Sequence, residues 1–237
     1  MSNPILPKQP LVAITGCRRG LGRALVEAYA GAGCRVLAHA RTEADARALA
    51  EVIEGDVHPH WGDVRDASLS EQFASSAERY GGVDLLILNA GVINTMGPLL
   101  EADIEEFESV MAINVNAQLR LLQRLVPAMK EKRAGAVLWL TSGLGRFGLP
   151  HYGAYCASKH AVEGLMKVLA EEAGESGVVS AAIAPGMVQT DMLKTALGTD
   201  DVREHQTPES TAKAFLAFTA ELSAEHNGQS LDIAGWL

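Results

Sequence analysis

The fold is decided by residues 11–32, which read LVAITGCRRGLGRALVEAYAGA. An apolar run, Leu11–Thr15, has the length of a buried strand, and the later part of the stretch has the apolar spacing of a helix. The turn between them contains Gly16, Gly20 and Gly22. Glycines in such a turn let the backbone approach a pyrophosphate, and the N-terminus of the following helix attracts its negative charge. The stretch therefore predicts a strand, a nucleotide-binding turn and a helix.

The same alternation of short apolar runs and helical segments continues along the chain. Strands are predicted at Leu11–Thr15, Arg35–Ala40, Val57–Gly62, Leu85–Leu88, Ala136–Leu140, Val178–Ala184 and Gln229–Ile233. Helices are predicted from the glycine-rich turn through about Ala32 and at Glu43–Glu54, Ser68–Tyr80, Glu105–Met129, Tyr152–Gly174 and Pro208–Glu221. Regular β-α alternation implies a parallel sheet with right-handed crossovers. We therefore expect one α/β domain over residues 1–237, a doubly wound parallel sheet of about seven strands with helices on both faces, the Rossmann fold.

The composition excludes several classes of protein. Of the 237 residues, 48% are apolar and 21% are charged, which argues against intrinsic disorder. No apolar run reaches the roughly 18 residues of a membrane helix, and the N-terminal residues lack the pattern of a secretory signal. The net charge is −9 and no basic block occurs, so neither a membrane nor a nucleic acid is an expected partner.

The chain also lacks a pattern for binding a metal. Cys17, Cys34 and Cys156 are odd in number and have neither metal nor redox spacing, so we expect reduced thiols in a cytoplasmic protein and no metal site. The segment His58-Pro59-His60 has no accompanying pattern of cysteine or carboxylate ligands. We interpret it as a surface turn.

The end of the second predicted strand indicates which nucleotide is bound. A site for NAD places Asp or Glu there, on the ribose 2′-hydroxyl. This chain has Ala38-His39-Ala40-Arg41 instead. The guanidinium of Arg41 matches a 2′-phosphate, and Arg19 in the glycine-rich turn is placed to face the same group. The two arginines favour NADPH over NADH. The alternative is that both are solvated surface residues, which leaves NAD open.

A second cluster of reactive side chains follows the fifth predicted strand. Tyr155 and Lys159 share one face of a helix because they are four residues apart. A free tyrosine titrates at about pH 10, and a neighbouring ammonium is expected to lower that pKa. The hydroxyl of Ser142 is placed to hydrogen-bond a substrate oxygen beside the phenol. The Tyr–Lys spacing is common in helices by chance, and it gains weight from its position at the ligand-binding edge of the sheet.

With these motifs the chain resembles the short-chain dehydrogenase/reductase family over nearly its full length. The residues that match the family's motifs are Thr15, Gly16, Gly20, Gly22, Asp63, Val64, Asn89, Ala90, Gly91, Asn114, Ser142, Tyr155, Lys159, Pro185, Gly186 and Thr190. The resemblance implies that the cofactor is NADP(H), held by Thr15, Gly16, Arg18, Arg19, Gly20, Leu21, Gly22, Arg41, Asp63, Val64, Asn89, Ala90, Gly91, Tyr155, Lys159, Pro185, Gly186, Val188 and Thr190.

The resemblance also implies a catalytic set of four residues. Tyr155 would be the general acid in reduction and the base in oxidation, and Lys159 would hold the nicotinamide ribose and lower the pKa of Tyr155. Ser142 would orient and polarise the carbonyl, and Asn114 would hold a water that relays protons from Lys159. The hydride would come from the cofactor.

Family resemblance also guides the expectations for substrate and assembly. Loop positions that line the substrate pocket in relatives correspond to Ser142, Leu144, Leu149, His151, Met187 and Met192. Residues 191–207 form a shorter substrate loop than is usual, which suggests an open site. Relatives assemble through long helices, here Glu105–Met129 and Tyr152–Gly174, so we expect a homo-oligomer, a tetramer or a dimer. Trp236 stands where relatives often have a glycine, so the contact near the C-terminus is expected to differ.

Together these observations predict an NADP(H)-dependent oxidoreductase that transfers a hydride between the cofactor and a small carbonyl or alcohol. A 3-oxoacyl-carrier-protein reductase is one possibility within that prediction. Two alternatives stay open: an NAD-dependent alcohol dehydrogenase of the same family, and a non-enzymatic NADP-sensing or scaffold protein on the same fold. The non-enzymatic alternative expects a broken catalytic set, whereas all four residues are present here.

Overall fold

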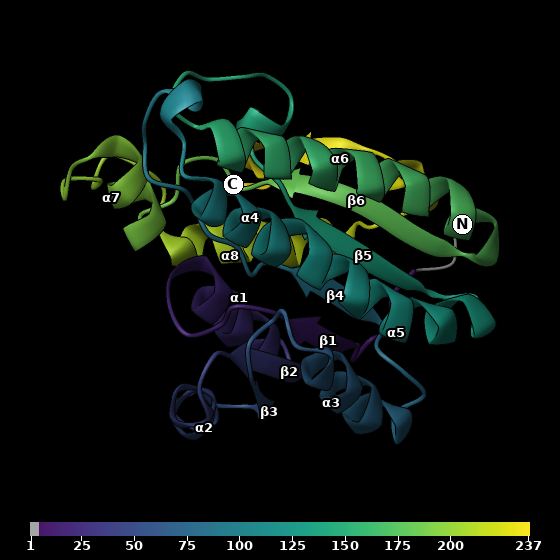
Figure 1. The fold of residues 1–237 in the computed structure, drawn as a ribbon. Coiled ribbons are helices and arrows are strands. Elements are labelled where there is room, and N and C mark those ends of the chain that lie inside the picture. Colours follow the sequence, from purple (N-terminus) through teal and green to yellow (C-terminus); the bar gives the residue numbers. More distant parts are fainter. Residues whose placement is uncertain (1–4) are drawn as a thin grey trace.

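The computed structural model describes residues 5–237. Its centre is one seven-stranded sheet in the order β3-β2-β1-β4-β5-β6-β7 (Figure 1). The strands are β1 (Leu11–Ile14), β2 (Arg35–Ala40), β3 (Asp56–Trp61), β4 (Leu85–Leu88), β5 (Gly135–Leu140), β6 (Val178–Ala184) and β7 (Ser230–Asp232). Every neighbouring pair is parallel, and the strand order reverses between β1 and β4. The doubly wound parallel sheet predicted from the sequence is confirmed.

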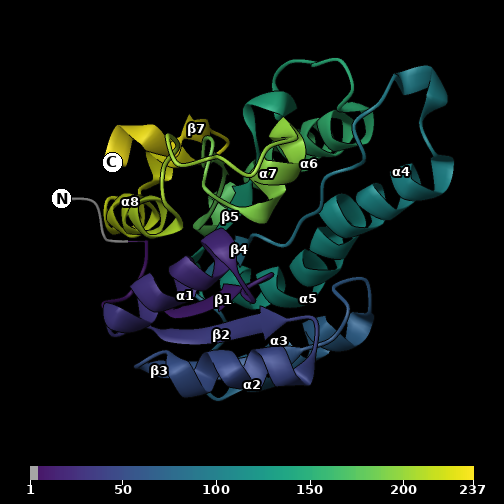
Figure 2. The same ribbon diagram turned by 90° about the vertical axis from the view of Figure 1, so that its left-hand side faces the viewer.

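Helices cover both faces of this sheet (Figure 2). One face is packed by α1 (Gly20–Gly31), α2 (Glu43–Val52) and α8 (Pro208–Ala220), and the other by α3 (Ala67–Glu78), α5 (Ala117–Glu131) and α6 (Gly153–Ala173). Leu25, Leu49 and Phe215 represent the first core, and Phe73, Leu121 and Val162 the second. β1, β4, β5 and β6 are buried along their whole lengths because both faces are covered, which explains why their sequences are continuously apolar.

The His-Pro-His segment corrects one expectation. It lies within β3, in register with β2, and not in a surface turn. β3 is the edge of the sheet, where proline is tolerated because its missing N–H faces no partner strand. The ring of His60 is buried and packs edge-on against Phe73, with 4.9 Å between ring centroids. The sequence supported both a strand over Val57–Gly62 and a turn within it. The packing of α3 against His60, which depends on the folded chain, decides for the strand.

Two helical regions also differ from the prediction. The single long helix expected at Glu105–Met129 consists of α4 (Ile104–Met111), a π-helical turn (Ala112–Asn116) and α5. Residues 191–207 are not only a loop, because α7 (Asp191–Leu197) occupies their first part. The other predicted elements begin and end within about two residues of their observed bounds, the usual uncertainty of helix and strand ends.

Among residues 5–237, no helix combines the length and the apolarity needed to cross a membrane. Over the same described residues, no group of three or more His, Cys, Asp or Glu side chains is placed to hold a metal ion. Cys17, Cys34 and Cys156 are buried and unpaired with one another.

Candidate active site

The glycine-rich turn after β1 closes tightly against the start of α1. Gly16 has a φ of +73° and Gly20 a φ of +57°, in the left-handed region that favours glycine. A Cβ at Gly22 would stand 2.1 Å from the carbonyl oxygen of Gly16, so only glycine lets α1 begin this close to the turn. The backbone of the turn, without side chains at these glycines, therefore lies beside the free N–H groups at the start of α1. This arrangement binds a pyrophosphate.

β4 holds the same turn from its other side. The hydroxyl of Thr15 accepts hydrogen bonds from the backbone N–H groups of Asn89 (3.1 Å) and Ala90 (2.9 Å). The side-chain amide of Asn89 donates to the carbonyls of Thr15 (2.7 Å) and Gly16 (3.1 Å). Two motifs that lie far apart in the sequence thus form one hydrogen-bonded unit where the strand order reverses, the position at which such sheets bind ligands.

Ser142, Tyr155 and Lys159 converge where β5 ends and α6 begins. The Nζ of Lys159 lies 5.5 Å from the centroid of the Tyr155 ring and donates to the carbonyl of Leu140 at 2.7 Å. The Oγ of Ser142 accepts from the N–H of Leu144 at 3.2 Å, and the Ser142 side chain acts on the Tyr155 phenol so as to lower its pKa. The three side chains expected to carry the chemistry are therefore brought together.

The protonation of this cluster differs from the expectation. Burial raises the pKa of Tyr155 to about 12, and the Ser142 side chain opposes that rise only in part. Burial lowers the pKa of Lys159 to about 8 because the ammonium has lost its water. Lys159 is not among the groups that shift the pKa of Tyr155 here, so the expected lowering of that pKa is not seen; the Nζ of Lys159 donates to the Leu140 carbonyl. The site holds a protonated phenol beside an amine that titrates near neutrality.

Asn114 lies in the π-helical turn and is fully buried. Its Oδ1 accepts from the N–H of Val92 at 2.8 Å, and its Nδ2 donates to the carbonyl of Val92 (2.9 Å) and to the Oγ of Ser158 (3.0 Å). Ser158 in turn donates to the carbonyl of Tyr155 at 2.8 Å. The amide of Asn114 therefore ties the segment after β4 to the helix that carries Tyr155. π-helical turns of this kind are frequent at functional sites.

The three candidate arginines have different neighbours. Arg19 forms an ion pair with Asp191, the first residue of α7. Arg18 pairs with Asp45 in the first turn of α2, with 3.1 Å between Nε and Oδ1. Arg41 is exposed and lies just before α2. Arg19, which the sequence places to face the same phosphate as Arg41, is bonded in this structure to the start of α7. Arg18 is the arginine tied to the segment that follows Arg41.

Two further residues belong to this end of the site. Thr42 caps α2 by accepting from the N–H of Asp45, a role that its position just before an acidic helix start would have revealed. Asp63 is held by Arg65, with 2.9 Å from Nε to Oδ1, and this hydrogen-bonded ion pair lowers the pKa of Asp63 to about 2. The side chains expected around the adenosine thus surround the ends of β2 and β3.

Residues 185–190 connect β6 to α7 and reach the glycine-rich turn. Gly186 has a φ of +76°. The hydroxyl of Thr190 donates to the carbonyl of Val188 (3.1 Å) and caps α7 by accepting from the N–H of Leu193 (3.2 Å). A Cβ at Gly20 would stand 3.0 Å from the Cγ2 of Thr190. The two ends of the expected cofactor site therefore pack directly on each other.

The substrate candidates come from three segments of the chain. They are Ser142 and Leu144 after β5, Leu149 and His151 before α6, and Met187 and Met192 beside the start of α7. Leu149 is 44% exposed and Met187 is 54% exposed. His151 has a φ of +75°, a strained conformation that often marks functional sites.

Sequence reasoning missed the role of two residues that position α6 and α7. The Oδ1 of Asn94 accepts from the backbone N–H of Tyr155 at 3.1 Å, across 61 residues of sequence. The hydroxyl of Tyr152 donates to the carbonyl of Ala196 at 2.6 Å and so ties α7 to the start of α6. No local pattern signals either contact, because each depends on how distant segments fold together.

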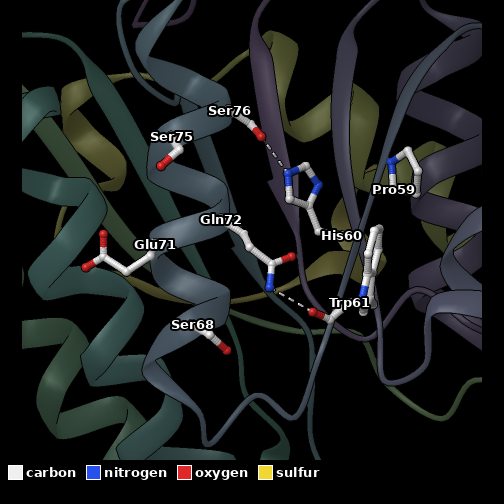
Figure 3. Close-up of a pocket in the computed structure, with 8 residues that line it drawn as sticks. All are labelled: Pro59, His60, Trp61, Ser68, Glu71, Gln72, Ser75 and Ser76. Atoms are coloured by element: carbon white, nitrogen blue, oxygen red, sulfur yellow. Dashed lines mark hydrogen bonds between the residues drawn. The ribbon is translucent and has the colours of Figure 1, made fainter.

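A groove of about 610 Å³ lies elsewhere, between β3 and α3 (Figure 3). His60 and Ser76 are joined across it by a 2.8 Å hydrogen bond, and Gln72 donates to the carbonyl of Trp61 at 3.0 Å. β2, β1 and β4 separate β3 from β5, the strand that precedes Ser142. The groove is therefore not part of the candidate active site.

Known proteins share both the sequence and the fold. The family model described as short chain dehydrogenase matches residues 10–201. An NADPH-dependent pterin aldehyde reductase of Arabidopsis thaliana is 33% identical over 225 residues, which cover 94% of this chain and 92% of that protein. A D-threitol dehydrogenase of Mycolicibacterium smegmatis is 32% identical over 238 residues, covering 94% and 90%. A short chain dehydrogenase structure from Shigella flexneri, complexed with NADP, has a TM-score of 0.87 and 31% identity, covering 97% and 98%.

The family match begins just before β1 and extends beyond α7, so it includes the glycine-rich turn, Tyr155 and Lys159. The chain belongs to the short chain dehydrogenase family and is an oxidoreductase of the hydride-transfer type.

Proposed function

We propose that this protein is an NADP(H)-dependent oxidoreductase that interconverts a small carbonyl compound and its alcohol, with Tyr155 as the general acid and base. The observation that carries the proposal is the convergence of Ser142, Tyr155 and Lys159 beside the glycine-rich end of the sheet. Such an arrangement places a proton donor next to a position where bare backbone accepts a dinucleotide.

The residues at this edge fit a nicotinamide dinucleotide. A pyrophosphate fits the turn at Gly16 and Gly22, where the absence of side chains lets the turn close against the segment after β4 and the start of α1. Arg18 and Arg41 flank the start of α2, and no carboxylate stands at the end of β2 to favour a 2′-hydroxyl. This arrangement favours a 2′-phosphate, which guanidinium groups bind well. When bound, the cofactor supplies or accepts the hydride.

The protein's own part is to move and position a proton. With a pKa of about 12, the hydroxyl of Tyr155 stays protonated at neutral pH, ready to donate to a developing alkoxide. Ser142, whose side chain lowers the pKa of Tyr155, is placed to hold the same substrate oxygen. Lys159, with a pKa of about 8, exchanges protons readily near neutrality and can restore the proton of Tyr155. Asn114 holds α6 in place against the segment after β4 through its hydrogen bonds to Ser158 and Val92.

Assembly, location and substrate complete the proposal. We propose a homo-oligomer, a tetramer or a dimer, formed through α4, α5 and α6. Three free cysteines and the absence of a basic block fit a cytoplasmic enzyme with no nucleic-acid partner. The half-exposed Leu149 and Met187 beside the site fit a small substrate with an apolar part. The NADPH-dependent relative supports the proposed cofactor.

Titrations with NADPH and with NADH, followed by nicotinamide fluorescence, test the cofactor. We expect NADPH to bind at least about tenfold more tightly, because a charge-assisted bidentate contact contributes about 1.5–3 kcal/mol. Arg41→Ala should remove most of that preference. Arg47→Ala is the matched control, since Arg47 is an exposed α2 arginine paired with Glu43. Equal or tighter binding of NADH would instead indicate an NAD-dependent alcohol dehydrogenase, and no binding of either would favour a non-enzymatic role.

A further inference from the structure

A line of hydrogen bonds crosses the carboxyl ends of four neighbouring strands. It starts at the carbonyl of Gly62 after β3, passes through the side chain of His39 at the end of β2, and reaches the N–H of Gly16 after β1. From the carbonyl of Gly16 it continues to the side-chain amide of Asn89 after β4. The peptide groups of Gly16 are therefore held from both sides, and His39 supplies the hold on one side.

The hydrogen bonds to Gly16 and Gly62 determine the protonation state of the His39 ring. Nδ1 lies 3.2 Å from the backbone nitrogen of Gly16, which can only donate, so Nδ1 must be without a proton. Nε2 lies 2.9 Å from the carbonyl oxygen of Gly62, which can only accept, so Nε2 must carry the proton. A charged ring would point an N–H at another N–H. Only the neutral Nε2–H tautomer satisfies both neighbours.

The surroundings of His39 agree with that state. The residue is 2% exposed, and burial lowers its pKa from the ordinary value, so the ring stays neutral. The backbone of His39 also takes part, because its carbonyl accepts from the N–H of Cys17 at 2.7 Å. His39 is thus hydrogen-bonded to two successive residues of the glycine-rich turn, Gly16 and Cys17, and to Gly62 at the start of the loop after β3.

We propose that His39, as a neutral Nε2–H tautomer, is a positioning residue for the dinucleotide: it fixes the glycine-rich turn relative to the loop that begins at Gly62. The inference rests on the proposed NADP(H) function. Gly16 adopts a left-handed φ and has no side chain to restrain it, so its position depends on what its backbone bonds. Without the acceptor on His39, the Gly16 N–H must seek another partner and the turn spends less time in the binding geometry. A lower population of that geometry weakens the apparent affinity in proportion.

Two substitutions at position 39 separate the contacts. His39→Asn places an amide oxygen near the position of Nδ1 and keeps an acceptor for Gly16, whereas His39→Gln places its amide near Nε2 and loses that acceptor. We expect NADPH to bind the Asn variant within about threefold of the wild type and the Gln variant about tenfold more weakly, the usual effect of one unsatisfied buried donor. Dissociation constants come from fluorescence titration, and melting temperatures are measured in parallel.

His60→Gln is the matched control. His60 is the neighbour of His39 on β3, is buried to a similar extent, and makes two hydrogen bonds, to the His58 carbonyl and the Ser76 hydroxyl (Figure 3). It contacts neither the glycine-rich turn nor Gly62 in these bonds. We expect this variant to melt lower but to bind NADPH like the wild type. Equal loss of affinity in the His39→Asn, His39→Gln and His60→Gln variants would overturn the proposal, because it would reduce His39 to a packing residue.

A measurement on the wild type keeps the inference testable if the variants fold poorly. The ¹⁵N shifts of the His39 ring distinguish a bare Nδ1 from a protonated one. A bare Nδ1 and a protonated Nε2 at neutral pH are the expected result, and the opposite tautomer or a charged ring would overturn the inference. Failure of the wild type to bind either nucleotide would instead count against the proposed function, while the tautomer would still decide whether His39 holds Gly16.

Discussion

Tyr155 is the residue on which the proposed chemistry depends. Its hydroxyl is the proton donor, and phenylalanine removes that oxygen while keeping the ring. We predict that Tyr155→Phe lowers kcat/KM for carbonyl reduction by about a thousandfold, within the usual range for loss of a general acid. NADPH affinity should change little, because the glycine-rich turn is untouched. Steady-state kinetics and fluorescence titration on one preparation check both parts.

Tyr80→Phe provides the comparison for this variant. Tyr80 lies just after α3, where its ring contacts the guanidinium groups of Arg35 and Arg79 and no residue of the catalytic set. Loss of the Tyr80 hydroxyl in this variant should leave turnover unchanged. Turnover retained in Tyr155→Phe would mean that another group supplies the proton, and the assignment of Tyr155 would be wrong.

Gly22→Ala, which replaces one hydrogen atom by a methyl group, tests how much the close packing of the turn contributes to stability. A methyl group there would collide with the Gly16 carbonyl at 2.1 Å, so the turn or the start of α1 must move. We predict that Gly22→Ala destabilises the fold by about 3 kcal/mol, as overpacking of a rigid backbone does, and weakens NADPH binding as well. Urea unfolding measures the first effect and titration the second.

The same helix offers a control for Gly22→Ala. At Gly31, the last residue of α1, an added methyl group would meet no atom within 4 Å, and the backbone has no positive φ. Gly31→Ala should be neutral or stabilising by up to about 1 kcal/mol, because alanine reduces the freedom of the unfolded chain. If both variants lost the same stability, close packing at the turn would not be the cause.

At the scale of elements, Arg146 joins the loop after β5 to β7 and α6. Its Nη1 donates to both carboxylate oxygens of Asp232, at 3.0 and 2.9 Å, and its Nε donates to the hydroxyl of Ser230 at 3.0 Å. Ser230 donates to Glu163, a buried carboxylate one turn along α6 from Lys159. These bonds fix the short helical turn that begins at Ser142.

We predict that Arg146→Ala lowers kcat about tenfold with little change in NADPH affinity, because it loosens the support of Ser142 and leaves the glycine-rich turn intact. Arg203→Ala removes a wholly exposed ion pair with Asp201 and should change neither quantity. Single-turnover rates and nucleotide titrations measure the two effects. A pure loss of affinity in Arg146→Ala would show that this arginine acts at the cofactor end instead.

Sequence separation decides which parts of this architecture were predictable. The strands and most helices follow from local apolar patterns, and the positions of Ser142, Tyr155 and Lys159 follow from motifs. The π-helical turn was not predictable, because Asn114 is held there by bonds to Val92, 22 residues earlier. The Arg146–Asp232 pair spans 86 residues and was equally hidden. The pKa of Tyr155 also depends on burial from several segments, which no spacing reveals.

At the scale of the whole molecule, the parallel, doubly wound character of the sheet follows from the chain's β-α alternation, but the roles of its buried polar residues do not. His39 and His60 face each other in register on β2 and β3, and both are buried. Burial lowers the pKa of His39, and it lowers the pKa of His60 to about 4. Each of these rings is therefore neutral in the folded protein at a pH where it would be charged in the unfolded chain.

This difference predicts a loss of stability in mild acid. An unfolded histidine takes up its proton at about pH 6.5, so between about pH 6.5 and 4 the unfolded chain binds more protons than the folded one. The free energy of unfolding should be full above about pH 6.5 and fall by about 2–3 kcal/mol from His60 alone as the pH drops to about 4, with His39 acting in the same direction. Urea unfolding at several pH values, from about 7.5 down to about 4.5, measures the slope.

His60→Gln should be less stable at neutral pH and show a shallower slope, because one buried titrating group is gone. Parallel curves for the wild type and the variant would mean that His60 already takes up its proton in the folded state near its ordinary pKa, and its hydrogen bond to Ser76 would then hold a charged ring.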